Sequence, residues 1–309
     1  MKKIKLLIIG YSKFAENRLV KSIKKISLID FRICSKSKIS NNVHYDNYLD
    51  GLNFSPDLIY ISLVNNLHYR YAKFFLKKGY NVIVDKPLAE NLKQTIDLIK
   101  IAKRKKVLLS EATLFNYHSV FKKILNLIGG KNNINLLQSN FNVPQFRSTK
   151  DIIKTKSDCF MDMSPYAASV IRLFLNFRNI KINSDIETFK NKKFIKSFYI
   201  FARDKSIKYF GNFSLDREYL SQIIFYTKNK IIYLPHQAFA LPAKKKIKII
   251  IKQNNSYKSI LFNKDDCICN YFYEIISCIK NKKYKKFYDI LIQDSKLRET
   301  IKLNFNKLK

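Results

Sequence analysis

The chain has 309 residues, 47% of them hydrophobic, which is enough for about two globular domains with real cores. Its formal net charge of +36 would by itself predict attraction to nucleic acid or to anionic membranes. The basic residues, however, are spread from Lys2 to Lys309 among Ile, Asn, Tyr and Phe. This spread is typical of a drift in composition and of solvated faces. We therefore expect neither a specific nucleic acid nor a membrane as partner.

The five cysteines are odd in number and include no CxxC pair, so they predict neither a disulfide framework nor a zinc site. We expect no bound metal. The first apolar stretch, residues 6–9, ends at Gly10 and is too short for a signal sequence or a membrane span. The sequence therefore favours a soluble protein of the cytoplasm.

Short apolar runs alternate with helical stretches over the first part of the chain. We expect strands at residues 4–9, 28–34, 58–63, 81–84 and 107–110, and helices at 14–25, 68–78 and 92–105. This alternation predicts an α/β domain over residues 1–120 with a Rossmann-type, doubly wound parallel sheet. Ligands of such sheets lie outside the carboxyl ends of the strands.

The pattern changes in the second part of the chain, residues 121–309. A helix at 160–175 is followed by strand-like runs at 194–202, 208–215, 221–227, 230–234, 247–253 and 258–262, and by helices at 269–279 and 288–303. Successive strands without helices between them predict an α+β domain with a largely antiparallel open sheet. The last helix packs either within this domain or back on the first one.

The first expected strand leads into Gly10-Tyr11-Ser12-Lys13-Phe14-Ala15, where a dinucleotide fold carries G-x-G-x-x-G/A. Gly10 permits the tight turn, Ala15 permits close helix packing, and Ser12 stands where the second glycine admits the pyrophosphate. The helix N-terminus still offers N–H groups and its dipole to a phosphate. Candidate cofactor contacts are Gly10, Ser12, Lys13, Phe14 and Ala15. A plain strand-turn-helix unit is the alternative interpretation.

The second expected strand is followed by Ser35-Lys36-Ser37-Lys38 and not by an acidic residue. An acid there would hold the ribose 2′-hydroxyl of NAD, whereas hydroxyls and cations suit a 2′-phosphate. Ser35, Lys36 and Lys38 therefore favour NADP as cofactor, with NAD second. The alternative is an ordinary lysine-rich loop in a lysine-rich chain.

Four further motifs follow one another along the chain. Residues 61–68 read ISLVNNLH, residues 84–89 read VDKPLA, Glu111-Ala112 precedes Tyr117-His118, and residues 162–166 read DMSPY. In order and spacing they resemble the S-T-P-N-x-L-H, E-K-P-L-A, E-A with aromatic-His, and D-x-G-x-H/Y patterns of the glucose-fructose oxidoreductase and inositol dehydrogenase family, written Gfo/Idh/MocA. The resemblance covers essentially the whole chain.

The resemblance implies hydride transfer between a nicotinamide and a hydroxyl or keto carbon of a sugar or nucleotide sugar. In the family, the lysine of E-K-P reaches the substrate oxygen and the next residue is commonly a cis proline, so Lys86 is the first candidate catalytic residue. An ammonium facing that oxygen stabilises the alkoxide that develops, and Asp85 could orient it. Further cofactor contacts implied by the family motifs are Ser62, Leu63, Asn65, His68, Asp85, Lys86 and Glu111.

Tyr166 takes the place where many family members carry a catalytic histidine, as in a tyrosine-type branch that resembles nucleotide-sugar ketoreductases. A phenol near a lysine can act as general acid toward a keto oxygen. Asp162 lies one helical turn earlier on the same face, so both are candidate catalytic residues. The alternative for Tyr166 is a core tyrosine with a satisfied hydroxyl. The family also implies a homodimer or homotetramer formed through the second-domain sheet.

Some positions depart from the family patterns. Ser12 replaces a glycine, Lys156-Ser157-Asp158 replaces G-G-G, and Asn116 replaces a common arginine. Lost glycines matter because a side chain then occupies space that a close backbone approach needs. The alternative function is therefore a catalytically impaired family member that acts as a binding or assembly protein.

Overall fold

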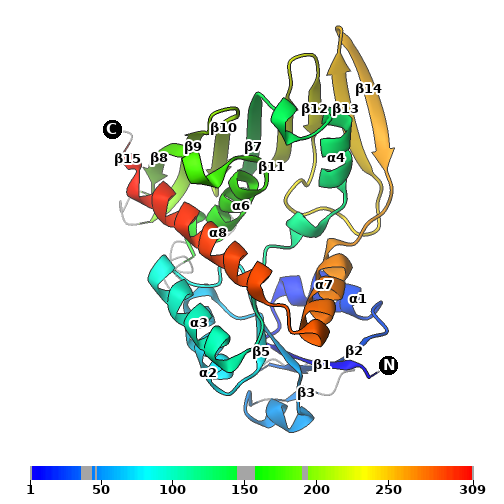
Figure 1. The fold of residues 1–309 in the computed structure, drawn as a ribbon, viewed down its shortest axis with the longest axis vertical. Helices are drawn as coiled ribbons and strands as arrows, with labels where there is room; N and C mark the ends of the chain where they lie inside the picture. Colours follow the sequence, from blue (N-terminus) through cyan, green and yellow to red (C-terminus); the bar gives the residue numbers. More distant parts are fainter. Residues whose placement is uncertain (1, 36–43, 46, 145–156, 190–193, 308–309) are drawn as a thin grey trace. The chain divides into compact units, whose positions relative to one another are not determined.

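The computed structural model describes most of the chain, in two compact units (Figure 1). The first unit contains residues 1–113 and 268–292, and the second contains residues 114–267 and 293–309. The residues whose structure is described are 2–35, 44–45, 47–144, 157–189 and 194–307.

The first unit contains a six-stranded sheet whose neighbouring strands are all parallel. Its strands are β1 (Ile4–Ile9), β2 (Ile29–Cys34), β3 (His44–Tyr45), β4 (Leu58–Ile61), β5 (Asn81–Asp85) and β6 (Leu109–Ala112). The order is β3-β2-β1-β4-β5-β6, so the direction in which strands are added reverses between β1 and β4. All four residues of β4 are buried, as expected for a strand covered on both faces. The prediction of a Rossmann-type sheet is confirmed.

Helices of the first unit follow the strands in sequence. A continuous helical run over residues 13–23 contains the π-helical segment η1 (Ala15–Leu19) and α1 (Val20–Ile23). The others are the 3-10 segment η2 (Asp50–Phe54), α2 (Asn65–Lys77), α3 (Leu92–Lys105), α7 (Cys267–Asn281) and the first part of α8 (Lys285–Leu303). Asn91 caps α3, because its side-chain oxygen accepts the N–H of Gln94 at 2.9 Å.

The second unit contains a nine-stranded sheet in the order β14-β13-β12-β11-β7-β10-β9-β8-β15. Its strands are β7 (Leu136–Asn142), β8 (Lys181–Thr188), β9 (Ile195–Arg203), β10 (Lys208–Ser214), β11 (Leu220–Tyr226), β12 (Ile231–Leu234), β13 (Ile247–Gln253), β14 (Ser256–Phe262) and β15 (Phe305–Lys307). The pairs β10–β7 and β15–β8 are parallel and the other pairs are antiparallel. The prediction of a largely antiparallel sheet is confirmed.

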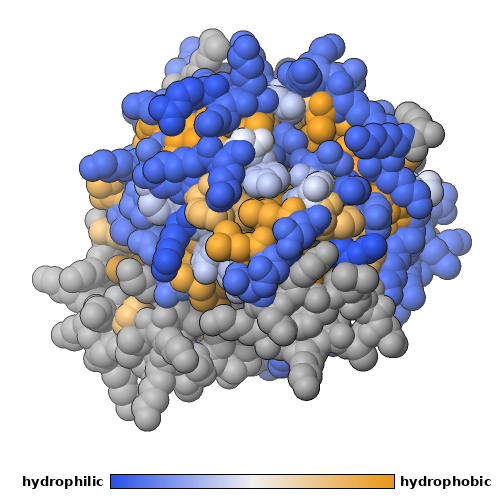
Figure 2. Space-filling view, turned by 90° about the horizontal axis from the view of Figure 1, so that it is seen from below, coloured by the Kyte–Doolittle hydropathy of each residue, from blue (hydrophilic) through white to orange (hydrophobic). Residues whose placement is uncertain are grey.

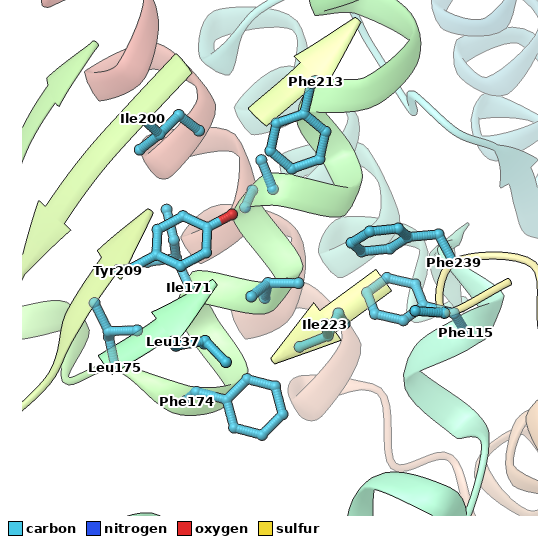
Figure 3. Close-up of a cluster of buried hydrophobic side chains, with 14 of the residues drawn as sticks. Phe115, Leu137, Ile171, Phe174, Leu175, Ile200, Tyr209, Phe213, Ile223 and Phe239 are labelled. Atoms are coloured by element: carbon cyan, nitrogen blue, oxygen red, sulfur yellow. The ribbon is translucent and has the colours of Figure 1, made fainter. Parts of the chain in front are cut away.

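Helix α6 (Cys159–Phe174) packs on this sheet and builds the core of the second unit. Asp158 caps it, since the carboxylate accepts the N–H of Met161 at 2.9 Å. Figure 3 shows part of the core, where Ile171 and Phe174 of α6 meet apolar side chains of the strands. The buried Tyr209 hydroxyl is satisfied by Ser139 Oγ at 2.6 Å. The remaining helical segments are η3 (Leu114–Tyr117), α4 (Val120–Ile128), η4 (Lys131–Asn133) and η5 (Phe177–Asn179).

The surface of the described residues is mostly polar but not uniformly so. On the face shown in Figure 2, hydrophilic side chains surround smaller hydrophobic areas. In the second unit, large apolar or aromatic side chains that reach solvent include Phe201, Tyr219, Tyr257 and Leu261. Within the described ranges, no helix combines the length and the apolar character that a membrane crossing requires.

Several elements differ from the sequence-based expectation. Strand β6 covers residues 109–112 and not 107–110, which places Glu111 inside a strand, and α2 begins at Asn65 and not at His68. Strands β3, β7, β8 and β15 and helix α4 were not expected. In β7 and β8 the cause is polar side chains at buried positions, such as Asn140 and Ser184, which interrupt the apolar pattern that indicates a strand.

Candidate functional site

The carboxyl ends of β1 and β4 meet where the strand order of the first sheet reverses, the usual ligand position in such sheets. Gly10 follows β1 directly and has a φ of +86°. A Cβ atom added at Gly10 would lie 2.4 Å from the carbonyl oxygen of Ser62, which follows β4. Both the backbone conformation and the close approach of Ser62 therefore require glycine here.

Ser12 caps the helical run that follows Gly10. Its Oγ accepts the N–H of Ala15 at 3.1 Å and forms a hydrogen bond of 2.7 Å with Ser62 Oγ. Because Lys13 and Phe14 begin the run, their N–H groups have no acceptor within the helix. Exposed N–H groups at the positive end of a helix are the donors that hold a phosphate. The residues present in this turn therefore fit a dinucleotide pyrophosphate.

The other predicted cofactor contacts near this turn are placed only in part. Ser35 follows β2, next to β1, and is 5% exposed. Lys36 and Lys38 lie outside the described residues. Leu63 packs against Gly10, since its Cδ2 lies 2.8 Å from the added Cβ, and Asn65 is the first residue of α2.

Asp85 ends β5 and joins the neighbouring strand by two hydrogen bonds. Its Oδ1 accepts the Tyr60 hydroxyl, and its Oδ2 accepts the Ser62 hydroxyl at 2.8 Å. Burial raises the pKa of Asp85, while these hydrogen bonds and the nearby His68 and Lys86 act to lower it. Burial, with the nearby Asp85, also raises the pKa of Tyr60 well above its usual value, so Tyr60 stays a phenol and donates.

The turn after β5 carries Lys86 and is anchored by His68 of α2. The Lys86–Pro87 peptide is cis, as the family resemblance implies. The His68 ring is fully buried, with Nδ1 2.7 Å from the carbonyl oxygen of Pro87 and Nε2 2.8 Å from that of Leu63. His68 therefore fixes the lysine turn to the loop that follows β4.

Glu111 of β6 anchors the same turn from the other side. Its Oε2 accepts the N–H of Leu88 at 2.6 Å, and its Oε1 accepts the Thr113 hydroxyl at 2.6 Å. Glu111 and His68 were both predicted as cofactor contacts. The structure shows them holding the backbone directly after Lys86, at Pro87 and Leu88, which is a positioning role; their contact with a cofactor stays a prediction.

Tyr166 and Asp162 belong to the second unit, on α6, one helical turn apart and both partly exposed. The Tyr166 ring centroid lies 5.8 Å from that of Phe115, 5.2 Å from Phe141 and 5.4 Å from Phe239. Aromatic rings therefore hold Tyr166 in place. Lys86 lies in the first unit, and the joint action of these residues with it stays a prediction.

Tyr60 is a site residue that the sequence analysis missed. It lies in a fully buried strand, two positions before Ser62. A signal was available, because a tyrosine inside a buried strand needs a partner for its hydroxyl.

Among the described residues, no group of three or more His, Cys, Asp and Glu side chains is arranged to hold a metal ion.

Comparison with known proteins finds a family match in the first part of the chain. Residues 4–113 match a family model described as the oxidoreductase family with an NAD-binding Rossmann fold, GFO_IDH_MocA. The dTDP-3,4-didehydro-2,6-dideoxy-alpha-D-glucose 3-reductase of Streptomyces violaceoruber is 31% identical over 98 residues, which are 31% of this chain and 28% of that protein. The scyllo-inositol 2-dehydrogenase (NADP(+)) IolU of Bacillus subtilis is 37% identical over 68 residues, 22% of this chain and 21% of that protein. The chain thus matches less than a third of either relative's length.

A solved structure resembles the whole chain. KijD10, a 3-ketoreductase from Actinomadura kijaniata in complex with NADP and TDP-benzene, superimposes with a TM-score of 0.91 over 99% of both chains, at 15% identity. At that identity the likeness shows a shared fold. The family match over residues 4–113 and this shared fold agree with the resemblance of the motifs around Lys86 to the Gfo/Idh/MocA family of oxidoreductases.

Proposed function

We propose that the chain is an oxidoreductase that prefers NADP to NAD and transfers a hydride between the nicotinamide and a hydroxyl or keto carbon of a nucleotide sugar. The observation that carries this proposal is the anchored turn of Lys86 at the end of β5. It lies at the same sheet edge as the Gly10 turn, separated from it by one strand, β4. A buried scaffold therefore holds a cation beside the usual ligand position of an α/β sheet.

In the first unit, some residues bind the cofactor and others take part in catalysis. The N–H groups of the Gly10 turn would hold the pyrophosphate, and bound NADP would supply the hydride chemistry. The Lys86 ammonium faces the reacting oxygen and stabilises the negative charge that develops there as the carbonyl becomes an alkoxide. Asp85, the preceding residue, supports the turn through its hydrogen bonds with Tyr60 and Ser62.

The substrate class comes from the relatives and is part of the proposal. The Streptomyces relative is named as a reductase at position 3 of a dTDP-deoxysugar, and KijD10 is a 3-ketoreductase solved with TDP-benzene. We infer that the substrate of this chain is a keto sugar, or the corresponding hydroxy sugar, carried on a nucleoside diphosphate.

Tyr166 is the proposed proton donor to the substrate oxygen, with Asp162 as its polar neighbour on α6. Replacing Tyr166 by Phe keeps the ring contacts with Phe115, Phe141 and Phe239 but removes the hydroxyl. We expect kcat to fall by about 10²–10⁴-fold, the range for general acid catalysis, with an unchanged melting temperature. An unchanged kcat would remove Tyr166 from the mechanism.

The function is tested by following NADPH absorbance with keto sugars on dTDP and UDP, and NADP reduction with the corresponding hydroxy sugars and with free sugars. Turnover of at least one nucleotide sugar, faster than of any free sugar, supports the proposal. The rival function, a binding or assembly protein without catalysis, predicts no turnover with any of them.

We also propose a homodimer or homotetramer in the cytoplasm, and light scattering of the purified protein tests the oligomeric state.

A further inference from the structure

The hydrogen bonds of Ser12, Ser62 and Asp85 form a chain whose direction follows from counting donors. A carboxylate only accepts, so the Ser62 hydroxyl donates to Asp85 Oδ2 while Asp85 is ionised. Ser62 has then used its one hydrogen and must accept from the Ser12 hydroxyl. The Ser12 hydrogen therefore points at Ser62, and Ser12 Oγ meets any further partner as an acceptor.

A phosphate bound at the Gly10 turn requires the hydrogen bonds of Ser12, Ser62 and Asp85 to run in the opposite direction. Ser12 stands where the second glycine of the dinucleotide motif admits the pyrophosphate. Phosphate oxygens accept hydrogen bonds, so they are repelled by an oxygen lone pair and attracted by an O–H group. If Asp85 is protonated on Oδ2, it donates to Ser62, Ser62 donates to Ser12, and Ser12 donates to the phosphate. The Tyr60 hydroxyl bonds to Oδ1 and is compatible with both directions.

We propose that Asp85 is a positioning residue for the cofactor pyrophosphate: through Ser62 it sets whether Ser12 donates or accepts, and cofactor binding takes up one proton from solvent. This inference rests on the proposed function, because it requires a dinucleotide at the Gly10 turn. Binding favours the protonated carboxyl, so the pKa of Asp85 is higher in the complex than in the free protein. The affinity therefore falls as the pH rises between the free and bound pKa.

The groups around Asp85 decide how readily it takes up that proton. Lys86, the next residue, and His68 of α2 favour the ionised carboxylate, as do the hydrogen bonds from Tyr60 and Ser62. Glu111 of β6 accepts hydrogen bonds from Leu88 and Thr113. Tyr271 of α7 lies near Tyr60, and its hydroxyl donates a hydrogen bond to Ser110. Burial outweighs these effects, so the pKa of Asp85 is raised from its usual value in the free protein, and the proposed cofactor complex raises it further.

Isothermal titration of the full chain with NADPH tests the inference, because the heat in buffers of different ionisation enthalpy reports the protons taken up. The titration is repeated over about pH 5 to 8, where proteins are most stable. NADH serves as a second ligand, since it lacks the 2′-phosphate, whose own pKa is about 6. We expect net proton uptake with both cofactors, and an affinity that changes by up to roughly tenfold per pH unit within the window.

Two variants identify the source of the proton. Asp85→Asn imitates the protonated carboxyl, because its amide nitrogen can donate to Ser62 and its oxygen can accept from Tyr60. Ser12→Gly removes the hydroxyl and restores the glycine of the motif. We expect both variants to bind NADH without proton uptake and with a pH-independent affinity.

The possible outcomes separate this inference from the proposed function. Wild-type binding without proton uptake, or equal uptake in Ser12→Gly, overturns the inference and leaves the cofactor assignment standing. The Ser12→Gly variant tests the inference even if Asp85→Asn fails to fold. Binding of neither NADPH nor NADH overturns the proposed function and the inference with it.

Discussion

In the first unit hydrogen bonds hold the turn that carries Lys86, whereas in the second unit aromatic rings hold Tyr166. His68 and Glu111 bond to the backbone at Pro87 and Leu88. Tyr166, by contrast, touches three phenylalanine rings. Hydrogen bonds are directional but add little net stability, about 0.5–1.5 kcal/mol each, while buried rings add more and tolerate small shifts. The two units should therefore respond differently to substitution.

The largest expected effect is on the stability of the second unit. Phe239 is 4% exposed and packs on Phe115, Phe141 and Tyr166 (Figure 3 shows its ring beside Phe115). We expect Phe239→Ala to lower the free energy of unfolding by about 3–5 kcal/mol, as measured by urea denaturation. The control is Phe201→Ala, half exposed on β9 of the same unit, for which we expect less than about 1 kcal/mol. Equal losses would show that the rings around Tyr166 are not a stabilising core.

The next effect is on catalysis in the first unit. We expect Lys86→Ala to lower kcat by about 10²–10³-fold, the usual cost of removing one group that stabilises a developing oxyanion. Steady-state kinetics measure this, with NADPH affinity and melting temperature nearly unchanged. Lys105→Ala is the control, because the exposed Lys105 is the last residue of α3, at the end of the helix opposite to the segment that follows Lys86, and the change in net charge is the same. Unchanged turnover of Lys86→Ala would exclude Lys86 from the reaction.

Substitution of two glycines distinguishes the cost of a left-handed backbone from the cost of a close contact with a neighbouring residue. Gly10 and Gly79 have φ values of +86° and +87°, but an added Cβ meets the Ser62 oxygen at Gly10 and nothing within 4 Å at Gly79. We expect Gly79→Ala to cost about 1–2 kcal/mol in unfolding free energy from the backbone alone, and Gly10→Ala to cost more. Thermal and chemical unfolding of both variants check this. Equal costs would mean that the contact with Ser62 relaxes without strain.

The smallest expected effect is on stability, from the polar groups around Glu187 in the second unit. Burial of Glu187 acts to raise its pKa, but hydrogen bonds from Tyr199 and Ser197 and the charges of Arg217 and Lys196 lower it on balance. Because the pKa of Glu187 is lower in the native than in the unfolded state, the ionised side chain stabilises the fold at pH values above its unfolded pKa. This stabilisation is lost as the pH falls through the native pKa. We expect Glu187→Gln to cost about 1 kcal/mol at pH 7, and to cost nothing well below about pH 4. Denaturation at several pH values measures the difference, and a loss as large as that of Phe239→Ala would contradict the contrast between hydrogen bonds and packed rings.

The sequence predicted the parts of the fold in which pattern and burial agree. Strand β4 is a continuous apolar run and β1 is interrupted only by Lys5, and α3, an amphipathic stretch that Asn91 caps, was predicted with its observed bounds. Strand β7 was missed although it lies inside the second sheet, because Asn140 and Asn142 are buried polar residues of that strand. Buried amides look like loop residues in a single sequence.

For the candidate site, motifs indicated the residues but not their contacts. Lys86 and Pro87 could be predicted from their place at a strand end. The roles of His68 and Glu111 could not, because their partners are backbone groups of distant segments. The link from Tyr60 through Asp85 to Ser62 depends on the strand order, which one sequence does not specify.

Titration of NADPH fluorescence with purified protein tests most directly whether the turn at Gly10 and the lysine at the end of β5 form a cofactor-dependent site. We predict saturable binding with a Kd between about 1 μM and 1 mM, the usual range for such ligands. Binding should weaken in Gly10→Ala and stay unchanged in Gly79→Ala. The absence of saturation for both NADPH and NADH at about 1 mM would contradict the assignment of this chain as an active oxidoreductase.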